Sequence, residues 1–423
     1  MSQEKVIEIE AKKWTRYHTY LITFFSIMNF FGLFNIVFGG FVLNEVAQSF
    51  GVSVTIIPII SSIAGIGLFF SIITRTFPDH FGRKKTLFVL SILAYTNLII
   101  HVLAPDIIIY TILGFVGSVL GTNTANVIIS EEIPADYRGT AVGIIQGIGM
   151  TAAPFSAFIS IFAGGFDSWR YIYLIMNIPA IIIFTILWLW LREPERYIQE
   201  KKLREEKGEG KPSIFAVFQR KYLKTFLMSS LLLFVTQFIY LTIKRYFKPF
   251  LIGERGHLGF NNATVGFWMI FIYIGSILGY YLSGYLADRL GRRRSIYITA
   301  SLYFIFNITF VISGTMWGIL VSFFGLNLSF SIFMIVATIY SFEFYSTKER
   351  STGSGWVQVL GNSAWIFANL VISIFVYSLK FSWGDTFLIL CFAPILMIII
   401  TYFMPETKAL ELEIIVEKFV EKK

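Results

Sequence analysis

Long apolar runs alternate with short polar segments over almost the whole chain. A helix needs about 20 predominantly apolar residues to cross the hydrocarbon core of a bilayer, and the runs between charged, proline or glycine breaks are close to that length. The runs predict twelve spanning helices, at 17–43, 52–75, 86–104, 107–132, 138–163, 170–191, 222–250, 263–287, 295–313, 316–345, 350–379 and 385–404. The pattern therefore predicts an all-α integral membrane protein.

The longest polar interruption divides these helices into two groups of six. We expect an N-terminal six-helix bundle at 1–191, a linker at 192–221, a C-terminal six-helix bundle at 222–404 and a tail at 405–423. The first twenty residues are polar, so no cleavable signal peptide is expected and the first helix should stay in the mature protein.

Composition and charge agree with a membrane protein. Hydrophobic residues make up 56% of the chain and charged residues 14%, against roughly 25% charged in a soluble domain, which excludes a soluble enzyme. With both termini in the cytoplasm, all but six of the 35 Lys and Arg residues lie on the cytoplasmic side of the predicted helices, as the positive-inside rule requires. We therefore attribute the net charge of +9 to topology in a multi-pass plasma-membrane protein, and not to binding of nucleic acid.

Metal and cofactor chemistry is not expected. The chain has one cysteine, Cys391, and four histidines that lie far apart in sequence, which argues against a metal site. The segment from Gly147 to Ala152 fits a dinucleotide-binding fingerprint loosely, but it lies inside an apolar helix, where small residues favour close helix packing. We find no cluster of catalytic groups and predict no enzyme.

The two groups of helices repeat each other. Three polar features recur after about 210 residues: Asp79 with Gly82–Lys85 and Asp288 with Gly291–Arg294, Glu131 with Arg138 and Glu343 with Arg350, and Pro194-Glu195 and Pro405-Glu406. Two pseudo-symmetric bundles that face each other create a cleft near the bilayer midplane, which is typical of alternating-access transporters.

The repeated loops resemble a known family signature. The segment from Gly284 to Arg294 matches the pattern G-x-x-x-D-x-x-G-R-[KR]-[KR] of the major facilitator superfamily, and residues 79–85 match it in part, with Arg75 at the place of the first glycine. The chain therefore resembles that superfamily over almost its whole length, and the resemblance implies the major facilitator fold.

Four further segments resemble the sugar-porter and metabolite-symporter branch, at 131–139, 343–350, 193–198 and 405–408. The resemblance implies an inner gate of charge pairs, which opens when the cleft faces inward. Static surface pairs are the alternative. The gate would comprise Asp79, Arg83, Glu131, Arg138, Glu195, Arg196, Asp288, Arg292, Glu343, Arg350 and Glu406.

Polar side chains inside spanning helices are the candidates for substrate binding, because they are costly in lipid. Gln237 lies about 22 Å along its helix, near the midplane, at 1.5 Å per residue. The full candidate set is Gln237, Tyr240, Gln146, Asn362, Trp365, Asn29 and Asn35. Each of these could instead bridge helices. The same count puts Lys244 at the outer boundary, where we expect it to reach into the headgroups.

These observations predict a secondary active transporter that moves a small polar solute, a sugar or an organic acid, by alternating access. Uptake coupled to protons is the preferred interpretation, and we expect the transporter to act as a monomer in the bilayer. Two alternatives remain: an uncoupled facilitator, because Asn35 occupies the place where proton symporters of this branch have an aspartate, and an exporter, because Ala153-Pro154 is similar to an element of drug antiporters.

Overall fold

The computed structural model describes residues 14–421 apart from 53–56, 122–123, 161–166, 207–214, 216–217, 346–349, 409 and 411. Within this part of the chain, twelve helical stretches are long and apolar enough to cross a membrane. The prediction of an all-α membrane protein with twelve spans is therefore confirmed.

The N-terminal half consists of α1 (Arg16–Phe41), α2 (Leu43–Ser49), α3 (Ile57–Gly65), α4 (Gly67–Phe81), α5 (Arg83–Val102), α6 (Ile107–Val119), α7 (Thr124–Glu132), α8 (Ala135–Met150), α9 (Ala152–Ser160) and α10 (Ser168–Trp188). A further helix, α11 (Glu195–Glu206), lies in the stretch that we expected to be a linker.

The C-terminal half consists of α12 (Arg220–Pro249), α13 (Asn262–Leu290), α14 (Arg292–Ile312), α15 (Met316–Phe342), α16 (Arg350–Asn362), α17 (Ala364–Ile372), α18 (Trp383–Leu390), α19 (Ala393–Tyr402) and α20 (Leu412–Val416). Short helical turns, η5 (Phe250–Glu254), η6 (Gly256–Leu258), η7 (Ser373–Ser378) and η8 (Glu417–Glu421), complete it.

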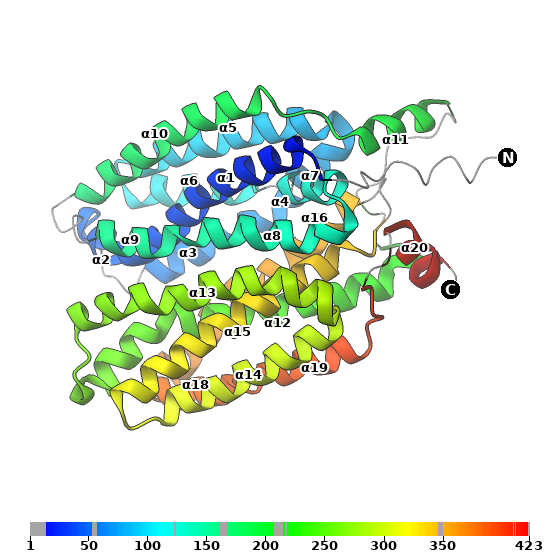
Figure 1. The fold of residues 1–423 in the computed structure, drawn as a ribbon. Coiled ribbons are helices and arrows are strands. Elements are labelled where there is room, and N and C mark those ends of the chain that lie inside the picture. Colours follow the sequence, from blue (N-terminus) through cyan, green and yellow to red (C-terminus); the bar gives the residue numbers. More distant parts are fainter. Residues whose placement is uncertain are drawn as a thin grey trace.

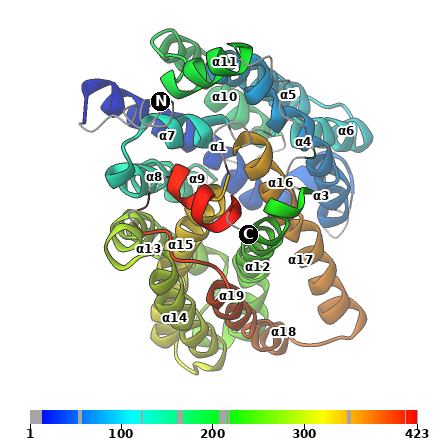
Figure 2. The ribbon, with the colours of Figure 1, turned by 90° about the vertical axis from the view of Figure 1, so that its right-hand side faces the viewer.

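The two halves lie side by side with their long helices roughly parallel (Figure 1). They meet where α8 and α9 pack on α13 and where α3 and α4 pack on α17 and α16. Viewed along the helices, α16 lies between α4 and α12 (Figure 2). The start of α1 and helix α20 lie at the same end of the molecule (Figure 1). We call it the charged end, because Arg83 and Arg292 bond there to Glu193 before α11 and to Glu406 before α20.

Several helices extend further than the sequence indicated. The second predicted span, 52–75, continues as α4 to Phe81, and the third begins at Arg83 in place of residue 86. The charges that we took as helix ends are buried, since Arg75, Asp79 and Arg83 are only 4%, 2% and 1% exposed. A paired, buried charge does not end a helix, so these predicted boundaries were wrong by three to six residues.

The fifth and eleventh spans are interrupted at equivalent places. Thr151 separates α8 from α9, and its hydroxyl donates to the carbonyl of Ile148 at 2.7 Å. Ser363 separates α16 from α17 in the same way, with a bond of 2.6 Å to Leu360. Hydroxyl groups that bond back to the preceding turn bend helices. The same kind of side-chain hydrogen bond therefore occurs at the interruption in each half.

Close packing between the halves depends on glycines. A Cβ at Gly143 would lie 2.8 Å from the carbonyl of Tyr280, and one at Gly284 would lie 2.5 Å from the carbonyl of Gly139. Small residues let membrane helices approach to backbone contact. The segment that loosely resembled a dinucleotide loop belongs to this row, since a Cβ at Gly147 would meet the ring of Tyr281 at 2.9 Å.

Candidate functional site

A buried charge cluster holds the N-terminal half together at the charged end. Arg83 donates to both carboxylate oxygens of Glu131, at 3.1 and 2.9 Å, and lies 3.3 Å from Asp79. It also donates to the carbonyl of Pro78 at 2.9 Å and stacks over the ring of Tyr197. The buried guanidinium group therefore has both ion-pair and hydrogen-bond partners, as a buried charge requires.

The C-terminal half contains the same cluster. Arg292 donates to Glu343 at 2.8 Å, lies 3.5 Å from Asp288 and donates to the carbonyl of Ala287 at 3.0 Å. Thr407 donates its hydroxyl to the second oxygen of Glu343. The sequence repeat thus corresponds to a repeated three-dimensional site.

Each cluster is completed by a glutamate that caps a helix. Glu406 accepts from the N–H groups of Arg292 and Arg293 at 2.9 and 3.1 Å, and Glu193 accepts from those of Arg83 and Lys84. A carboxylate is favoured at a helix N-terminus because it satisfies unpaired N–H groups and the helix dipole. Burial nevertheless raises the pKa of Glu193.

The glycines of the two signature loops make room for these caps. Gly82 and Gly291 have φ of +95° and +93°, a region that side chains rarely adopt. A Cβ at either position would lie 3.0 or 2.8 Å from the capping carboxylate. We assigned Glu195 to the cluster from its proline neighbour, but the residue that occupies this place is Glu193.

The aspartates of the clusters link the two halves. Asp79 accepts from the N–H of Thr352 at 3.0 Å and from its hydroxyl at 2.9 Å, near the start of α16. Asp288 accepts from the hydroxyl of Thr140 on α8 at 3.3 Å. Arg75, in place of the signature glycine, donates to Gln358 of the opposite half. The charged end is therefore closed by polar contacts between the halves.

The remaining predicted gate residues lie around this closure. Arg138 is buried and donates to the carbonyl of Ile133 at 3.4 Å. Glu195 has an exposed side chain, and its N–H donates to Glu132, while Arg196 follows it on α11. Arg350 begins α16, and its side chain lies outside the described part of the structure.

The candidate amides of the N-terminal half bond to each other. Asn29 donates to Gln146 at 3.0 Å, which joins α1 to α8. Asn35 exchanges two hydrogen bonds with Asn177 of α10, at 2.8 and 2.9 Å. In this conformation these side chains bridge helices, which was the alternative to substrate binding.

Two candidates of the C-terminal half also bond to each other. Gln237 of α12 donates to Asn362 of α16 at 3.1 Å, and both side chains are half-buried. Trp365 is also half-buried, and its ring lies 3.8 Å from the position of a Cβ on Gly65, in the opposite half. This part of α12, α16 and α17 therefore lies close to the boundary between the halves.

The prediction that Lys244 reaches into the headgroups is wrong. Its ammonium group donates to Ser276 of α13 at 3.1 Å, and Ser276 donates to Asn327 of α15 at 3.1 Å. The same ammonium group lies 4.9 Å from the ring centre of Tyr240 and 5.2 Å from that of Phe330. Lys244 therefore places a half-buried cation between three helices of the C-terminal bundle.

Comparison with known proteins identifies the family. The family model of the Major Facilitator Superfamily matches residues 19–250 and 233–419. The chain belongs to this superfamily. It is therefore a multi-pass membrane protein of a transporter family, as the signature loops indicated.

Two relatives of the chain are named after organic acids. The chain is 29% identical to the cis,cis-muconate transport protein of Acinetobacter baylyi, over 51% of its own length and 52% of that protein. It is 26% identical to the niacin transporter NiaP of the same organism, over 70% of this chain and 72% of NiaP. The first match thus spans about half of the relative.

A solved structure confirms the architecture. The proton:xylose symporter XylE, bound to 6-bromo-6-deoxy-D-glucose, superposes with a TM-score of 0.78 over 95% of this chain and 99% of XylE. Sequence identity is 15%, so the similarity establishes the fold alone.

Replacement of Gly284 by alanine tests the backbone contact at the charged end. The new methyl group would meet the Gly139 carbonyl, which cannot rotate away, and overpacking of this kind costs about 1–3 kcal/mol. We expect the closed charged end to become less stable and transport in proteoliposomes to slow about five-fold or more.

Gly266→Ala on the same helix is the control, because nothing lies within 4 Å of a Cβ there. Equal transport by both variants would show that the contact between Gly139 and Gly284 does not limit the cycle.

Proposed function

We propose that the protein transports a small organic acid and binds its carboxylate at Lys244. The observation that carries this proposal is the position of the Lys244 ammonium group, inside the bundle beside Ser276 and two aromatic rings. Within the described part of the chain, Lys244 has no carboxylate partner at ion-pair distance. A cation in a spanning segment is costly unless it meets an anion or water, so a carboxylate substrate would supply the missing partner.

The surroundings of Lys244 favour an acid with a planar, unsaturated body. Tyr240 stacks on Phe330 with a centroid distance of 4.6 Å, and Tyr273 and Tyr280 of α13 lie in the core cluster that joins the halves. Aromatic side chains bind flat, conjugated groups well. The two relatives are named after muconate and niacin. Both compounds are unsaturated carboxylic acids, which supports an organic acid over a sugar as the substrate.

Gln237 and Asn362 are proposed to bind the opposite end of the substrate. Both are half-buried and lie nearer the charged end of the bundle than Lys244, because Gln237 precedes Lys244 by seven residues on a helix that begins at that end. An amide pair of this kind can exchange its mutual hydrogen bond for bonds to a substrate. Trp365 would supply an additional stacking face.

We propose that the charged end faces the cytoplasm and acts as the inner gate. Asp79 and Asp288 bond across the halves, while their partners Arg83 and Arg292 remain bound to Glu131 and Glu343 within each half. Opening can therefore break the contacts to Thr352 and Thr140 without leaving either arginine unpaired. Because one chain supplies both halves, a monomer suffices.

We further propose that uptake is coupled to protons. Import of an anion against a negative interior costs about 2.3 kcal/mol per charge at 100 mV. A proton carried with the acid removes this cost. We expect an acidic exterior to accelerate uptake into proteoliposomes that are clamped at zero membrane potential, whereas an uncoupled facilitator would respond only to the gradient of the acid.

Uptake of labelled nicotinate, benzoate, muconate and xylose into proteoliposomes tests the proposed function. We expect uptake of at least one acid, which the other acids inhibit and xylose does not. Transport of xylose without transport of any of the acids would contradict an organic-acid substrate. Accumulation of the acid only when protons flow in the opposite direction would identify an exporter.

A further inference from the structure

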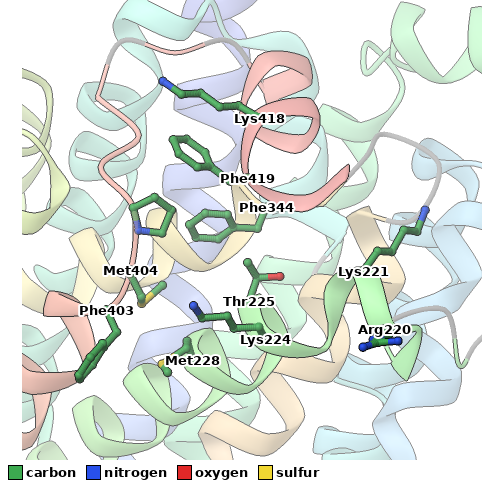
Figure 3. A pocket seen from close by; sticks show the side chains of 11 residues that line it. Arg220, Lys221, Lys224, Thr225, Met228, Phe344, Phe403, Met404, Lys418 and Phe419 are labelled. Carbon is green, nitrogen blue, oxygen red and sulfur yellow. The ribbon is translucent and has the colours of Figure 1, made fainter. Parts of the chain in front are cut away.

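A pocket of about 670 Å³ lies at the charged end of the C-terminal half (Figure 3). Its walls are the first turns of α12, Phe344 after α15, the segment that follows α19, and η8. These elements are far apart in sequence, and the pocket lies outside the region of Lys244 and the contacts between the halves. Neither the family resemblance nor the proposed transport cycle assigns it a role.

The pocket is strongly cationic. Four of the eleven described residues that line it are Lys or Arg, and none of the eleven is acidic. Arg220, Lys221 and Lys224 come from α12, and Lys418 comes from η8. Lys224 and Lys418 lie on opposite sides of the pocket in Figure 3. Four basic residues and no acidic residue among the described lining residues favour an anionic ligand in this pocket.

The pocket also has apolar lining residues. Phe344, Met228 and Met404 line it together with the basic residues. Phe403 is 58% exposed, and Leu227, one turn beyond Lys224 on α12, is 54% exposed. Large apolar side chains on the outer surface of a spanning segment face lipid chains.

The level of the pocket in the membrane follows from the spans that form it. The candidate span of α12 begins at Arg220, and the last span ends at Tyr402. The cationic groups therefore lie where the hydrocarbon core gives way to the headgroups, and the apolar residues lie just inside it. Basic pockets at this level on the cytoplasmic side suit anionic lipid headgroups.

We propose that this pocket binds an anionic phospholipid of the leaflet at the charged end. The phosphate group would bind to Lys224, Arg220 and Lys418, and an acyl chain would lie against Phe403 and Leu227. The site adjoins the C-terminal charge cluster, because Phe344 follows Glu343 and Pro405 precedes Glu406. A bound lipid would therefore brace the elements that carry Glu343 and Glu406.

Lipid titration of the purified full-length protein in detergent tests this proposal. Phosphatidylglycerol, phosphatidylcholine and soluble glycerol 1-phosphate would be titrated separately, with binding measured by native mass spectrometry and by the shift in melting temperature. We expect phosphatidylglycerol to bind most tightly. The double variant Lys224→Gln, Lys418→Gln should bind it about 30-fold more weakly, since each cation near an anionic headgroup contributes about a factor of five.

The matched control is Lys248→Gln, Lys380→Gln, which removes two exposed lysines at the opposite end of the molecule. It should bind phosphatidylglycerol as the parent does. Both altered lysines of the pocket are exposed, so the fold should persist, and the melting temperature without lipid checks this. Equal phosphatidylglycerol affinity in both double variants would overturn the proposal. Equally tight binding of glycerol 1-phosphate would overturn it in favour of a soluble anion, and equally tight binding of phosphatidylcholine would refute a role for net charge.

Discussion

Lys244→Gln is expected to weaken binding of a carboxylate substrate by about 30-fold or more. Loss of one partner from a desolvated, hydrogen-bonded charge pair costs about 2–5 kcal/mol, and 1.4 kcal/mol corresponds to a factor of ten. Glutamine retains a donor for Ser276 but lacks the charge. Isothermal titration of purified protein with nicotinate or benzoate, whichever the parent binds, would measure the change.

Two controls separate the charge of Lys244 from its packing. Lys244→Arg keeps the cation and should lose less affinity than Lys244→Gln, while Lys248→Gln removes an exposed lysine from the same helix and should bind as the parent does. If Lys244→Gln retains parental affinity, the ammonium group has a structural role between α12, α13 and α15, and the carboxylate site lies elsewhere.

The double variant Asp79→Asn, Asp288→Asn is expected to open the charged end. Each aspartate accepts bonds from the opposite half, and a hydrogen bond to a charged group contributes about 1.5–3 kcal/mol. Loss of both charges should lower the ratio of closed to open molecules by about 100-fold or more. Arg83 and Arg292 keep Glu131 and Glu343 as partners, so we expect the fold to persist.

The single native cysteine makes this change measurable. Cys391→Ser with Gln237→Cys gives one thiol at the boundary between the halves. A membrane-impermeant maleimide added from the charged end should label this thiol much faster when both aspartates are replaced. Asp106→Asn, at an exposed helix cap of the opposite end, is the control. Unchanged labelling by the double variant would contradict the proposed gate.

The spans and the clusters of the charged end were largely predictable from sequence. Length and apolarity define a spanning helix, and the recurrence of Asp79, Arg83 and Glu131 as Asp288, Arg292 and Glu343 indicated one site in two copies. The capping role of Glu193 was missed, because the proline of the repeat directed attention to Glu195. Only the folded chain shows which carboxylate reaches the N–H groups of Arg83 and Lys84.

The environment of Lys244 was not predictable from its depth along the helix. A count of 1.5 Å per residue locates the Cα atom, but helical side chains point back toward the N-terminus of their helix. The long Lys244 side chain therefore returns past Tyr240, one turn earlier, and reaches the interior of the bundle. The direction of the Lys244 side chain depends on where α13 and α15 pack, and the sequence of α12 alone does not predict this packing.

The hydrogen-bond partners of the candidate amide side chains were also not predictable from their depth in the membrane. Sequence placed Asn29, Gln146 and Asn35 at suitable depths, yet the angular position of each helix decides whether an amide faces the boundary or a neighbouring helix. In the structure Asn29 meets Gln146 and Asn35 meets Asn177. Binding by these three side chains would require their mutual bonds to exchange for substrate.

The most direct test of the account compares nicotinate with nicotinamide in the parent and in Lys244→Gln. The two compounds have the same ring and nearly the same size, and differ in the charge of the group that would meet Lys244. We predict that the parent binds nicotinate at least about 30-fold more tightly than nicotinamide, measured directly or by competition with the transported acid. We predict that Lys244→Gln abolishes this preference. Equal preference for nicotinate in both proteins would contradict the assignment of Lys244 as the carboxylate site.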